Sequence, residues 1–434
     1  MSVLAMAQLT ATGNPAIAAD LLDVYDMAIN SDPQYRQVAA AKLATLEQYP
    51  QALSQLLPSI NLSANTRTND LDISTQGIGE QGDIEFNSHG WSLDMRQPLF
   101  RLDRFIQLRQ ANSLIKQADA ELTAAQLDLI VRVAENYFNV LAAKDNLEFA
   151  YAEKKSLGRQ LEQAKQRFEV GLTAITDVQE AQAGYDLAIA EEIEARNNVD
   201  NSSEELREIT GSYTAEFSAL GEFLPLARPE PEDIDTWTEI SLQQNLDVIA
   251  TLSAIETARK EIKVQQSGHL PTLDLIGRRD FIRSGGRFGA IQIHSSTIGL
   301  ELNVPIFQGG LVSSRTRESR QRLEEQLQKL EQVRRQAQRL TRQAYLGVIS
   351  GISRVKALKQ ALISSETALQ ATEAGFEVGT RTAVDVVASE RATSQSRRNY
   401  AQARYDYILN TLRLKRSAGI LSLEDLANVN HWLN

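Results

Sequence analysis

The 434-residue chain contains no cysteine, and this absence excludes a disulfide framework, a thiolate nucleophile and any cysteine-ligated metal site. It also excludes a lipid-bearing N-terminal cysteine. A basic surplus is missing as well, because the formal net charge at pH 7 is −11. Nucleic-acid binding needs clustered positive charge, so we expect no nucleic-acid partner.

Long apolar runs and late prolines are missing too. Beyond the N-terminal residues no stretch of about 18 apolar residues occurs, so we expect no membrane-spanning helix. All ten prolines lie at or before Pro305, and none lies between Pro98 and Pro225. Because proline breaks the interior of a helix, residues 101–222 and 308–434 are free to form very long helices.

The N-terminal residues 1–18 are mostly small and apolar, and Ala16-Ile17-Ala18 is typical of a signal-peptidase site before Ala19. Residues 1–10 contain no Lys or Arg, although an export signal normally begins with a basic segment. We expect residues 1–18 to be an export signal that is trimmed off. An ordinary N-terminal segment is the alternative.

The most informative feature that is present is an internal duplication with a spacing of 208 residues. The matched pairs are Phe168 and Phe376, Glu169 and Glu377, Val170 and Val378, Gly171 and Gly379, Asp177 and Asp385, and Val178 and Val386. Such a repeat predicts two copies of one elongated unit. We place the repeats at 19–211 and 236–419, with a linker at 212–235 that holds three prolines and a C-terminal segment at 420–434.

Each repeat contains two stretches in which apolar and polar residues alternate, the pattern of an amphipathic strand. The stretches are 57–65 and 91–96 in the first repeat, and 270–275 and 298–304 in the second. Glycine-bearing polar loops are expected at 67–89 and 278–294. Helices are expected before the strands, over 20–57 with a possible kink at Pro50 and over 237–268. Strands of about ten residues can span a bilayer when tilted.

After each pair of strands, a heptad-like apolar pattern without proline predicts one long helix, over 101–168 and over 309–376. At 1.5 Å per residue each helix would reach about 100 Å. Each helix then turns at a tip and returns, to Gly211 in the first repeat and to Gly419 in the second. Each repeat is therefore expected to contain one long helical hairpin.

Four strands are too few to close a barrel, because small barrels need about eight. An open sheet edge is not tolerated in lipid, where unpaired backbone groups cost several kcal/mol each. Other copies of the chain must then supply the missing strands, and three copies give twelve. The predicted fold class is mainly α with transmembrane β. Internally duplicated, coiled-coil-like helical hairpins form a trimeric α-barrel, and four strands per chain contribute to a 12-stranded β-barrel.

Three sets of motifs carry a family resemblance. They are Val-Gly-Leu-Thr-Ala-Ile-Thr-Asp-Val at 170–178 with Val-Gly-Thr-Arg-Thr-Ala-Val-Asp-Val at 378–386, the Leu-Pro starts of two strands, and Pro-Ile-Phe-Gln-Gly-Gly at 305–310. From about residue 21 to residue 426 the chain resembles the TolC family of trimeric outer-membrane efflux and secretion channel proteins. The resemblance implies a homotrimeric exit duct that contacts outer-membrane lipid and projects into the periplasm. It also implies docking to a periplasmic adaptor (a membrane fusion protein) and, through it, to an inner-membrane pump.

The resemblance further implies a gate at the hairpin tips, made by Asp385, Arg381, Asp177, Thr176 and Phe376. Arg381 matches an arginine that links to the first tip, here at Thr176 and Asp177. Asp385 matches a ring of carboxylates at the constriction. Ala388 stands where many members have a second aspartate, so we expect weaker cation selectivity unless Glu390 replaces it. Phe376 stands where many members have a tyrosine, so a looser closed state is expected. The adaptor is expected to dock at Gly171, Leu172, Gly379 and Thr380.

Other functions have little support in the sequence. No nucleophile and base are paired, so we expect no enzyme activity, and the four scattered histidines predict no metal site. The spacing of glycines at 77–82 resembles a dinucleotide-binding motif but lacks its helix, so no cofactor is expected. The main alternative is a periplasmic coiled-coil adaptor or structural protein of an export complex, which would need one hairpin and no strand pairs. The sequence does not distinguish drugs from a secreted polypeptide as the cargo.

Overall fold

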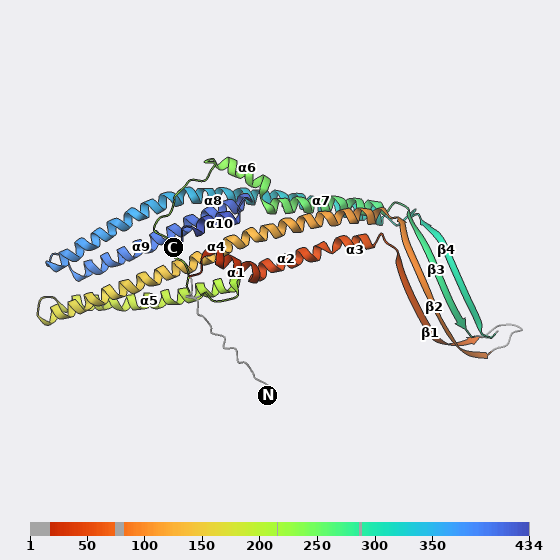
Figure 1. Cartoon of the computed structure of the whole chain (residues 1–434), viewed down its shortest axis with the longest axis horizontal. Coiled ribbons are helices and arrows are strands. Elements are labelled where there is room, and N and C mark those ends of the chain that lie inside the picture. The colour runs from red at the N-terminus through yellow and green to blue at the C-terminus, as the bar shows by residue number, and fades with distance from the viewer. Residues whose placement is uncertain (1–17, 74–81, 215, 286–288, 434) are drawn as a thin grey trace, which may run out of the picture. The chain divides into compact units, whose positions relative to one another are not determined.

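The computed structural model describes residues 18–73, 82–214, 216–285 and 289–433 (Figure 1). Residues 1–17 of the expected export signal and most of the glycine motif at 77–82 lie outside this range. The chain divides into two units. The first comprises 1–40, 121–249 and 333–434, and the second comprises 41–120 and 250–332.

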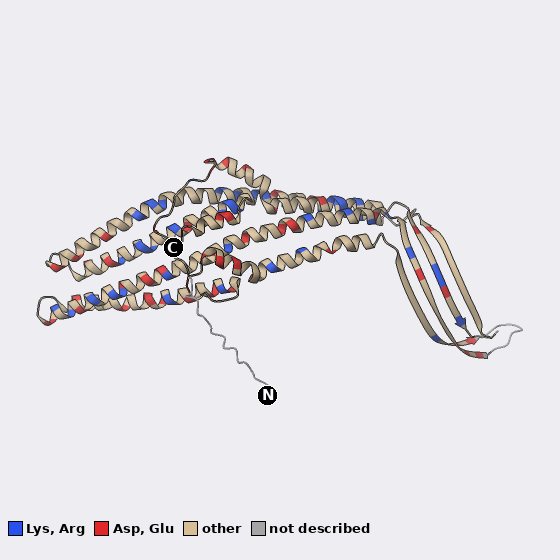
Figure 2. Cartoon of the chain, in the orientation of Figure 1, with Lys and Arg blue, Asp and Glu red and all other residues tan. Residues whose placement is uncertain are grey.

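Two helical hairpins dominate the first unit, which contains their two long helices only from residues 121 and 333 onward. Helix α4 (Leu102–Glu169) has 68 residues and returns as α5 (Ile175–Thr210), while α8 (Leu311–Glu377) has 67 residues and returns as α9 (Ala383–Ala418). These helices confirm the long proline-free helices and the 208-residue duplication. Basic and acidic residues are both scattered along the two hairpins (Figure 2). Among the described helices, none is both long and apolar enough to cross a membrane.

The returning helices end alike. Both α5 and α9 have 36 residues and stop at a glycine with left-handed backbone, Gly211 at φ 73° and Gly419 at φ 78°. This conformation costs a residue with a Cβ roughly 1–2 kcal/mol, and glycine avoids the cost. The predicted helix ends at these two glycines are therefore confirmed.

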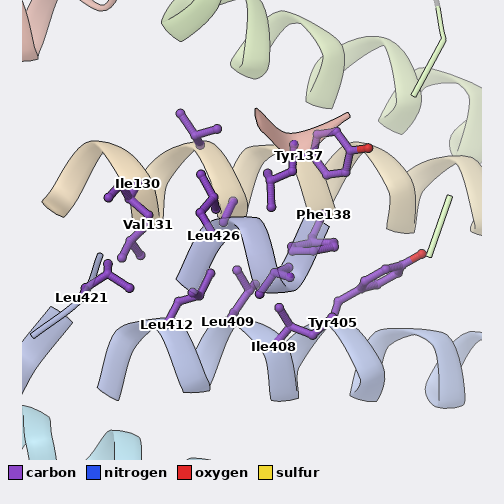
Figure 3. Packing of buried hydrophobic residues seen from close by; sticks show 14 of the residues in the cluster. Ile130, Val131, Tyr137, Phe138, Tyr405, Ile408, Leu409, Leu412, Leu421 and Leu426 are labelled. Carbon is purple, nitrogen blue, oxygen red and sulfur yellow. The ribbon is translucent and has the colours of Figure 1, made fainter. Parts of the chain in front are cut away.

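The core of the first unit lies where α4 and α9 meet the short helices α1 (Leu21–Ser31), α6 (Ile234–Gln244) and α10 (Leu423–Asn430). Figure 3 shows Tyr137 and Phe138 of α4 above Ile408 and Leu412 of α9, with Leu426 of α10 between them. All five side chains are almost completely buried. Burial of each such side chain contributes about 1.5–3 kcal/mol, so this core holds the two hairpins together at one end.

The prediction of one helix over 20–57 is wrong. The segment forms α1, α2 (Pro33–Leu46) and α3 (Gln48–Ser54). The first break falls at Asp32 (φ −59°, ψ 117°), because the residue before a proline is forced out of the helical region. Pro50 does not break α3, because it is the third residue of that helix, where a backbone N–H has no partner within the helix.

The prediction of one helix over 237–268 is also wrong, because Asn245 separates α6 from α7 (Leu246–Ser267). Its backbone is extended, at φ −61° and ψ 125°. Its side-chain oxygen accepts hydrogen bonds from the N–H groups of Asp247 and Val248, at 3.0 and 3.2 Å. These bonds satisfy two N–H groups that begin α7, as an N-cap does.

The second unit contains one antiparallel sheet of four strands in the order β1 (Ser59–Ile73), β2 (Gly82–Phe100), β3 (Thr272–Ser284) and β4 (Ile291–Asn303). Four strands per chain were predicted, and this is confirmed. The strands have 15, 19, 13 and 13 residues, so the expected loops at 67–89 and 278–294 are wrong over most of their length. Polar pairs extend the ladder, such as Thr68 Oγ1 donating to Asn87 Oδ1 at 2.9 Å.

The register gives the sheet one apolar and one polar face. Residues directly opposite in a ladder lie on the same face. Ile60 pairs with Met95 and Leu62 with Leu93 on one face, and Asn61 pairs with Asp94 on the other. The same alternation continues in β3 and β4, where Leu275 pairs with Leu300 and Asp274 pairs with Glu301. The predicted alternation is therefore confirmed.

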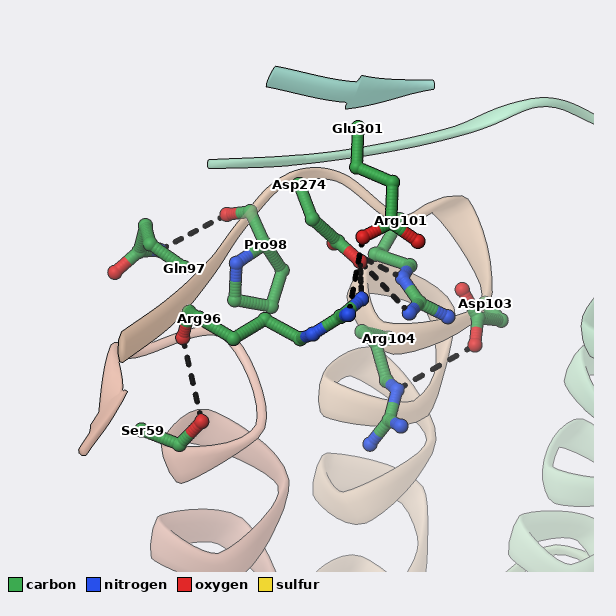
Figure 4. Close-up of polar contacts among 9 residues, drawn as sticks. All are labelled: Ser59, Arg96, Gln97, Pro98, Arg101, Asp103, Arg104, Asp274 and Glu301. Carbon is green, nitrogen blue, oxygen red and sulfur yellow. Dashed lines mark hydrogen bonds and ion pairs between the residues drawn. The ribbon is translucent and has the colours of Figure 1, made fainter. Parts of the chain in front are cut away.

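An ion-pair network on the polar face joins three strands to the start of α4 (Figure 4). Asp274 is 3% exposed and lies 2.8 Å from Arg96 Nη1 and 3.2 Å from Arg101 Nη2. The second guanidinium nitrogen of Arg96 lies 3.1 Å from Glu301 Oε2. A buried carboxylate without a partner is costly. The network therefore holds Arg101, at the start of α4, against the ends of the strands.

Candidate gate at the hairpin tips

The two hairpin tips share one backbone design. In the first tip, Gly171 has φ 76°, and the N–H of Leu172 donates to the carbonyl of Arg167 at 2.8 Å. In the second tip, Gly379 has φ 80°, and the N–H of Thr380 donates to the carbonyl of Gly375 at 2.8 Å. This pattern is the Schellman motif, which ends a helix with a left-handed glycine. The predicted turns are confirmed.

The residues expected to contact the adaptor lie at the outermost points of these turns. They are Gly171, Leu172, Gly379 and Thr380, and all four are exposed. Leu172 is 77% exposed, and a Cβ added at Gly171 or Gly379 would have nothing within 4 Å. The two glycines are therefore required by their backbone conformation and not by crowding. Adaptor docking at these residues stays a prediction.

Asp385 is held at the first turn of α9 by a capping box. Its carboxylate accepts hydrogen bonds from the N–H of Thr382 at 2.9 Å and from the Thr382 hydroxyl at 3.0 Å, and that hydroxyl accepts from the Asp385 N–H at 3.3 Å. The hydrogen bonds from Thr382, together with the charge of Arg381, lower the pKa of Asp385. The carboxylate of Asp385 is therefore ionised at neutral pH. Its place in a ring of carboxylates stays a prediction.

Asp177 occupies the matching position in α5 but is held differently. Its helix begins after Ala174, which has no side-chain oxygen for a cap. The carboxylate of Asp177 instead accepts a hydrogen bond from the hydroxyl of Thr173. Thr176 lies exposed in the first turn of the same helix. The two matched aspartates therefore share a position in the repeat and differ in their partners.

Arg381 lies against Gly375 of its own hairpin tip. Its side chain packs over Gly375, where an added Cβ would lie 2.7 Å from Arg381 Cγ. Among the residues that the structure describes, no ion pair joins Arg381 to Asp177, and no hydrogen bond joins it to Thr176. The predicted link is not made within one chain. A link between neighbouring chains stays a prediction.

Phe376 has a partner that the sequence did not reveal. The guanidinium carbon of Arg167 lies 4.4 Å from the centre of the Phe376 ring, and Arg167 Nη1 donates to the Phe376 carbonyl at 3.4 Å. Both residues are half-buried. The contact joins the last turn of α4 to the last turn of α8. The one sequence signal is that Arg167 aligns with Gly375 in the duplication, so the tips differ at this position.

Glu390 is buried between the hairpins and offers no exposed carboxylate to a constriction. It is 8% exposed, and the hydroxyl of Ser156 in α4 donates to it. Burial raises the pKa of Glu390. The possibility that Glu390 replaces the missing second aspartate is therefore contradicted by its position. Ala388 is exposed and carries no carboxylate, so Asp385 alone remains of the two aspartate positions that the resemblance implies.

The described residues contain no cluster of three or more His, Asp or Glu side chains placed to hold a metal ion. The tips instead combine two exposed glycine turns, the matched carboxylates of Asp177 and Asp385, and the contact between Arg167 and Phe376. Carboxylates attract cations, and the contact between Arg167 and Phe376 joins the two hairpins.

Comparison with known proteins identifies the family. The family model described as "Outer membrane efflux protein" matches residues 24–212 and 237–420. Outer membrane protein TolC of Vibrio cholerae is 37% identical over 420 residues, which cover 96% of this chain and 94% of that protein. Outer membrane protein TolC of Escherichia coli is 34% identical over 430 residues, covering 96% and 85%.

Solved structures share the fold. The outer membrane channel CmeC of Campylobacter jejuni superposes with a TM-score of 0.78 at 16% identity, covering 100% of this chain and 98% of that chain. The outer membrane protein VceC of Vibrio cholerae gives a TM-score of 0.76 at 17% identity, covering 92% and 96%. The family model matches most of the chain in two segments, and the two TolC proteins are more than 30% identical to it over nearly its whole length. This chain therefore belongs to the outer membrane efflux protein family.

Proposed function

We propose that the chain is the outer-membrane exit duct of a tripartite efflux or type I secretion system. The duct is a passive channel, and it opens at its hairpin tips when a periplasmic adaptor docks and an inner-membrane pump supplies the energy. The observation that carries this proposal is the sheet of the second unit. Its apolar face is exposed in the single chain, with Ile298 86%, Leu300 66% and Leu62 72% exposed.

Such a face is unstable in water but stable in hydrocarbon. Each Å² of apolar surface removed from water contributes about 25 cal/mol, and a lipid bilayer supplies that environment. The two edge strands, β1 and β4, have no further strand of the same chain beside them in the described sheet. Lipid does not tolerate unpaired edges, so three chains that pair β1 with β4 of a neighbour make a closed barrel of twelve strands. This argument supports a homotrimer.

The relatives support the outer-membrane location and both classes of cargo. TolC is named as an outer membrane protein in two organisms, and the alkaline protease secretion protein AprF of Pseudomonas aeruginosa is 29% identical over 417 residues. The family is one of efflux channel proteins, and we propose no enzymatic activity. The two matched segments also support the division into repeats at 19–211 and 236–419, with 212–235 as the linker and 420–434 as a terminal segment.

The gate and the docking surface are part of the same proposal. Asp385 from three chains forms a ring of carboxylates, and Arg381 links to Thr176 and Asp177 of a neighbouring chain. The exposure of Arg381 and its lack of an ion pair with Asp177 in its own chain, among the described residues, favour such a link. The adaptor docks on the turn residues named above. The alternative of a coiled-coil adaptor is disfavoured, because the chain carries two hairpins and four strands.

The test is detergent-dependent purification, followed by mass measurement in detergent and conductance recording in planar lipid bilayers. A trimer that forms discrete channels is the expected result, and a monomer that is stable in detergent-free buffer would contradict the proposal. Ile298→Lys is expected to block insertion, because a cation on the lipid face costs about 2–4 kcal/mol at the bilayer midplane. Thr297→Lys is the matched control, because Thr297 is the preceding residue on the polar face.

A further inference from the structure

Arg167 connects the two hairpin tips of one chain through two contacts to a single residue. Its guanidinium carbon lies 4.4 Å from the centre of the Phe376 ring, and its Nη1 atom reaches the Phe376 carbonyl at 3.4 Å. A planar guanidinium can stack on a ring and donate hydrogen bonds at the same time, which an ammonium group does less well. The contact therefore depends on arginine at one end and on an aromatic ring at the other.

Both residues belong to the hydrogen-bonded turns that close the tips. The carbonyl of Arg167 accepts from the N–H of Leu172 at 2.8 Å, and the carbonyl of Phe376 accepts from the N–H of Gly379 at 3.1 Å. Each turn is complete without the other. Separation of the tips would break the contact between Arg167 and Phe376 while leaving both turns intact, so the contact is suited to a reversible link.

The equivalent contact between the matched positions of the duplication is not possible. The residue that matches Arg167 in the second repeat is Gly375, which has no side chain, and Arg381 covers the place where one would start. The residue that matches Phe376 is Phe168, which is 42% exposed. No residue at position 375 can therefore hold Phe168 as Arg167 holds Phe376. One arginine per chain, and three per trimer, would carry the link.

We propose that Arg167 is a latch that holds the α8–α9 tip against the α4–α5 hairpin in the resting channel. Opening then requires that the three contacts between Arg167 and Phe376 break. This inference rests on the proposed channel function. It differs from the predicted link of Arg381, because it acts within one chain and through a ring and not through a carboxylate.

The test is single-channel recording of the purified full-length protein in planar bilayers. Arg167→Ala is expected to raise the open probability about two- to fivefold for each latch, which corresponds to about 0.5–1 kcal/mol for one cation–π contact that water still reaches. Phe376→Leu is expected to act alike, and Arg167→Lys to fall between. Arg159→Ala is the matched control for charge, because Arg159 is exposed on the same helix. Phe168→Leu is the matched control for the ring.

A double-mutant cycle decides whether the two residues act as one unit. The variant that combines Arg167→Ala with Phe376→Leu is expected to open no more than either single variant, because the same contact is removed. Additive effects would overturn the latch, as would an open probability in Arg167→Ala equal to that in Arg159→Ala. If Arg167→Ala does not assemble, Phe376→Leu removes the contact from the other side, and unchanged opening there overturns the latch. Absence of channels in the unsubstituted protein would overturn the proposed function itself, which is a different result.

Discussion

Glu153 of α4 and Arg398 of α9 form an ion pair that crosses from the first hairpin to the second. The carboxylate oxygen lies 3.5 Å from Arg398 Nη1, and the Glu153 residue is 2% exposed. Glu390 of α9 is a second buried carboxylate on this interface, against Ser156 of α4. The other charged groups that act on the two carboxylates are Glu191 of α5, Glu373 of α8 and Arg397 of α9. A polar interface of this kind makes the pairing of the hairpins sensitive to pH.

The first prediction concerns that sensitivity. Burial raises the pKa of Glu153 and of Glu390. A carboxyl group whose pKa is higher in the folded state stabilises the fold fully below its unfolded pKa, and this contribution is lost as the pH rises through the folded pKa. Mild acidification should therefore strengthen the pairing of the hairpins. Glu390→Gln is expected to raise the thermal midpoint at pH 7.5 by on the order of 2 °C, and to reduce its change between pH 7.5 and pH 5.

The measurement is thermal unfolding in detergent at several pH values, with circular dichroism as the signal. Glu194→Gln is the control, because Glu194 is exposed on α5 and its replacement should leave the pH profile unchanged. If both variants keep the pH profile of the unsubstituted protein, the buried carboxylates do not control the pairing.

The second prediction concerns the buried ion pair beside the break between α1 and α2. Asp32 is 2% exposed and accepts from both terminal nitrogens of Arg132, at 3.1 and 2.7 Å, and from the N–H of Tyr35 at 2.7 Å. Burial alone would raise the pKa of Asp32, but the hydrogen bonds and charge of Arg132 and the N–H of Tyr35 outweigh it, so the pKa is lowered. The pair therefore stabilises the fold above the usual aspartate pKa, and its contribution is lost as the pH falls through the folded pKa.

Asp32→Ala leaves Arg132 without its partner, and this is expected to cost about 3–5 kcal/mol at pH 7.5. Arg228→Ala is the contrast, because Arg228 and Glu232 form an exposed pair on the surface. Such pairs contribute about 0–1 kcal/mol. Denaturant unfolding of both variants measures the difference. Equal losses of stability would mean that burial does not distinguish the two pairs.

The third prediction compares the two glycines that end the returning helices. Both have left-handed backbone, so alanine at either position costs about 1–2 kcal/mol. At Gly211 an added Cβ would lie 3.3 Å from Ser31 Cβ, whereas at Gly419 it would lie 2.2 Å from the carbonyl oxygen of Gln244. The backbone of Gln244 would have to move, so Gly419→Ala should cost more than 3 kcal/mol in total, roughly the upper range for single substitutions.

The yield of folded trimer and its thermal midpoint measure this difference. Because the two positions match in the duplication, each variant is the control for the other. Similar stabilities of Gly211→Ala and Gly419→Ala would show that the close contact with Gln244 relaxes without cost.

Much of the helical architecture could be predicted, because its signals are local or repeated. The absence of proline after Pro305 and the 208-residue spacing located both hairpins, and Gly211 and Gly419 located their ends. The break at Asp32 was missed, although Pro33 directly follows it and a kink was expected only at Pro50. The strand ends were missed for a different reason. Thr68 and its partner Asn87 are both polar, so an apolar alternation could not reveal that the ladder continues.

The candidate gate was predictable only in part. The repeated sequence around Gly171 and Gly379 predicts a turn at each glycine, and the structure confirms both turns. The contact between Arg167 and Phe376 joins residues 209 positions apart. It depends on two long helices lying side by side at their ends, and no pattern within either helix encodes that distance. The sequence contains the capping-box spacing Thr382-x-x-Asp385. Asp385 was interpreted only as a gate residue of the family, so its role as a helix cap was missed.

The last prediction separates these two roles of Asp385. Asp385→Asn removes the charge of the proposed ring, so the preference of the channel for cations over anions is expected to fall several-fold, because a ring of like charges sets that preference. The same substitution also weakens the cap of α9, which contributes about 1 kcal/mol. Thr382→Ala weakens the cap in the same way but keeps the carboxylate. It should therefore retain the cation preference.

Reversal potentials in a salt gradient give the selectivity of each variant. A loss in Asp385→Asn with retention in Thr382→Ala assigns the effect to the carboxylate. A similar loss in both variants would assign it to the cap, because only the cap is weakened in both. If Asp385→Asn keeps the full preference for cations, Asp385 does not face the permeation path. Ala388→Asp would then show whether position 388, which is exposed one turn further along α9, faces the permeation path instead.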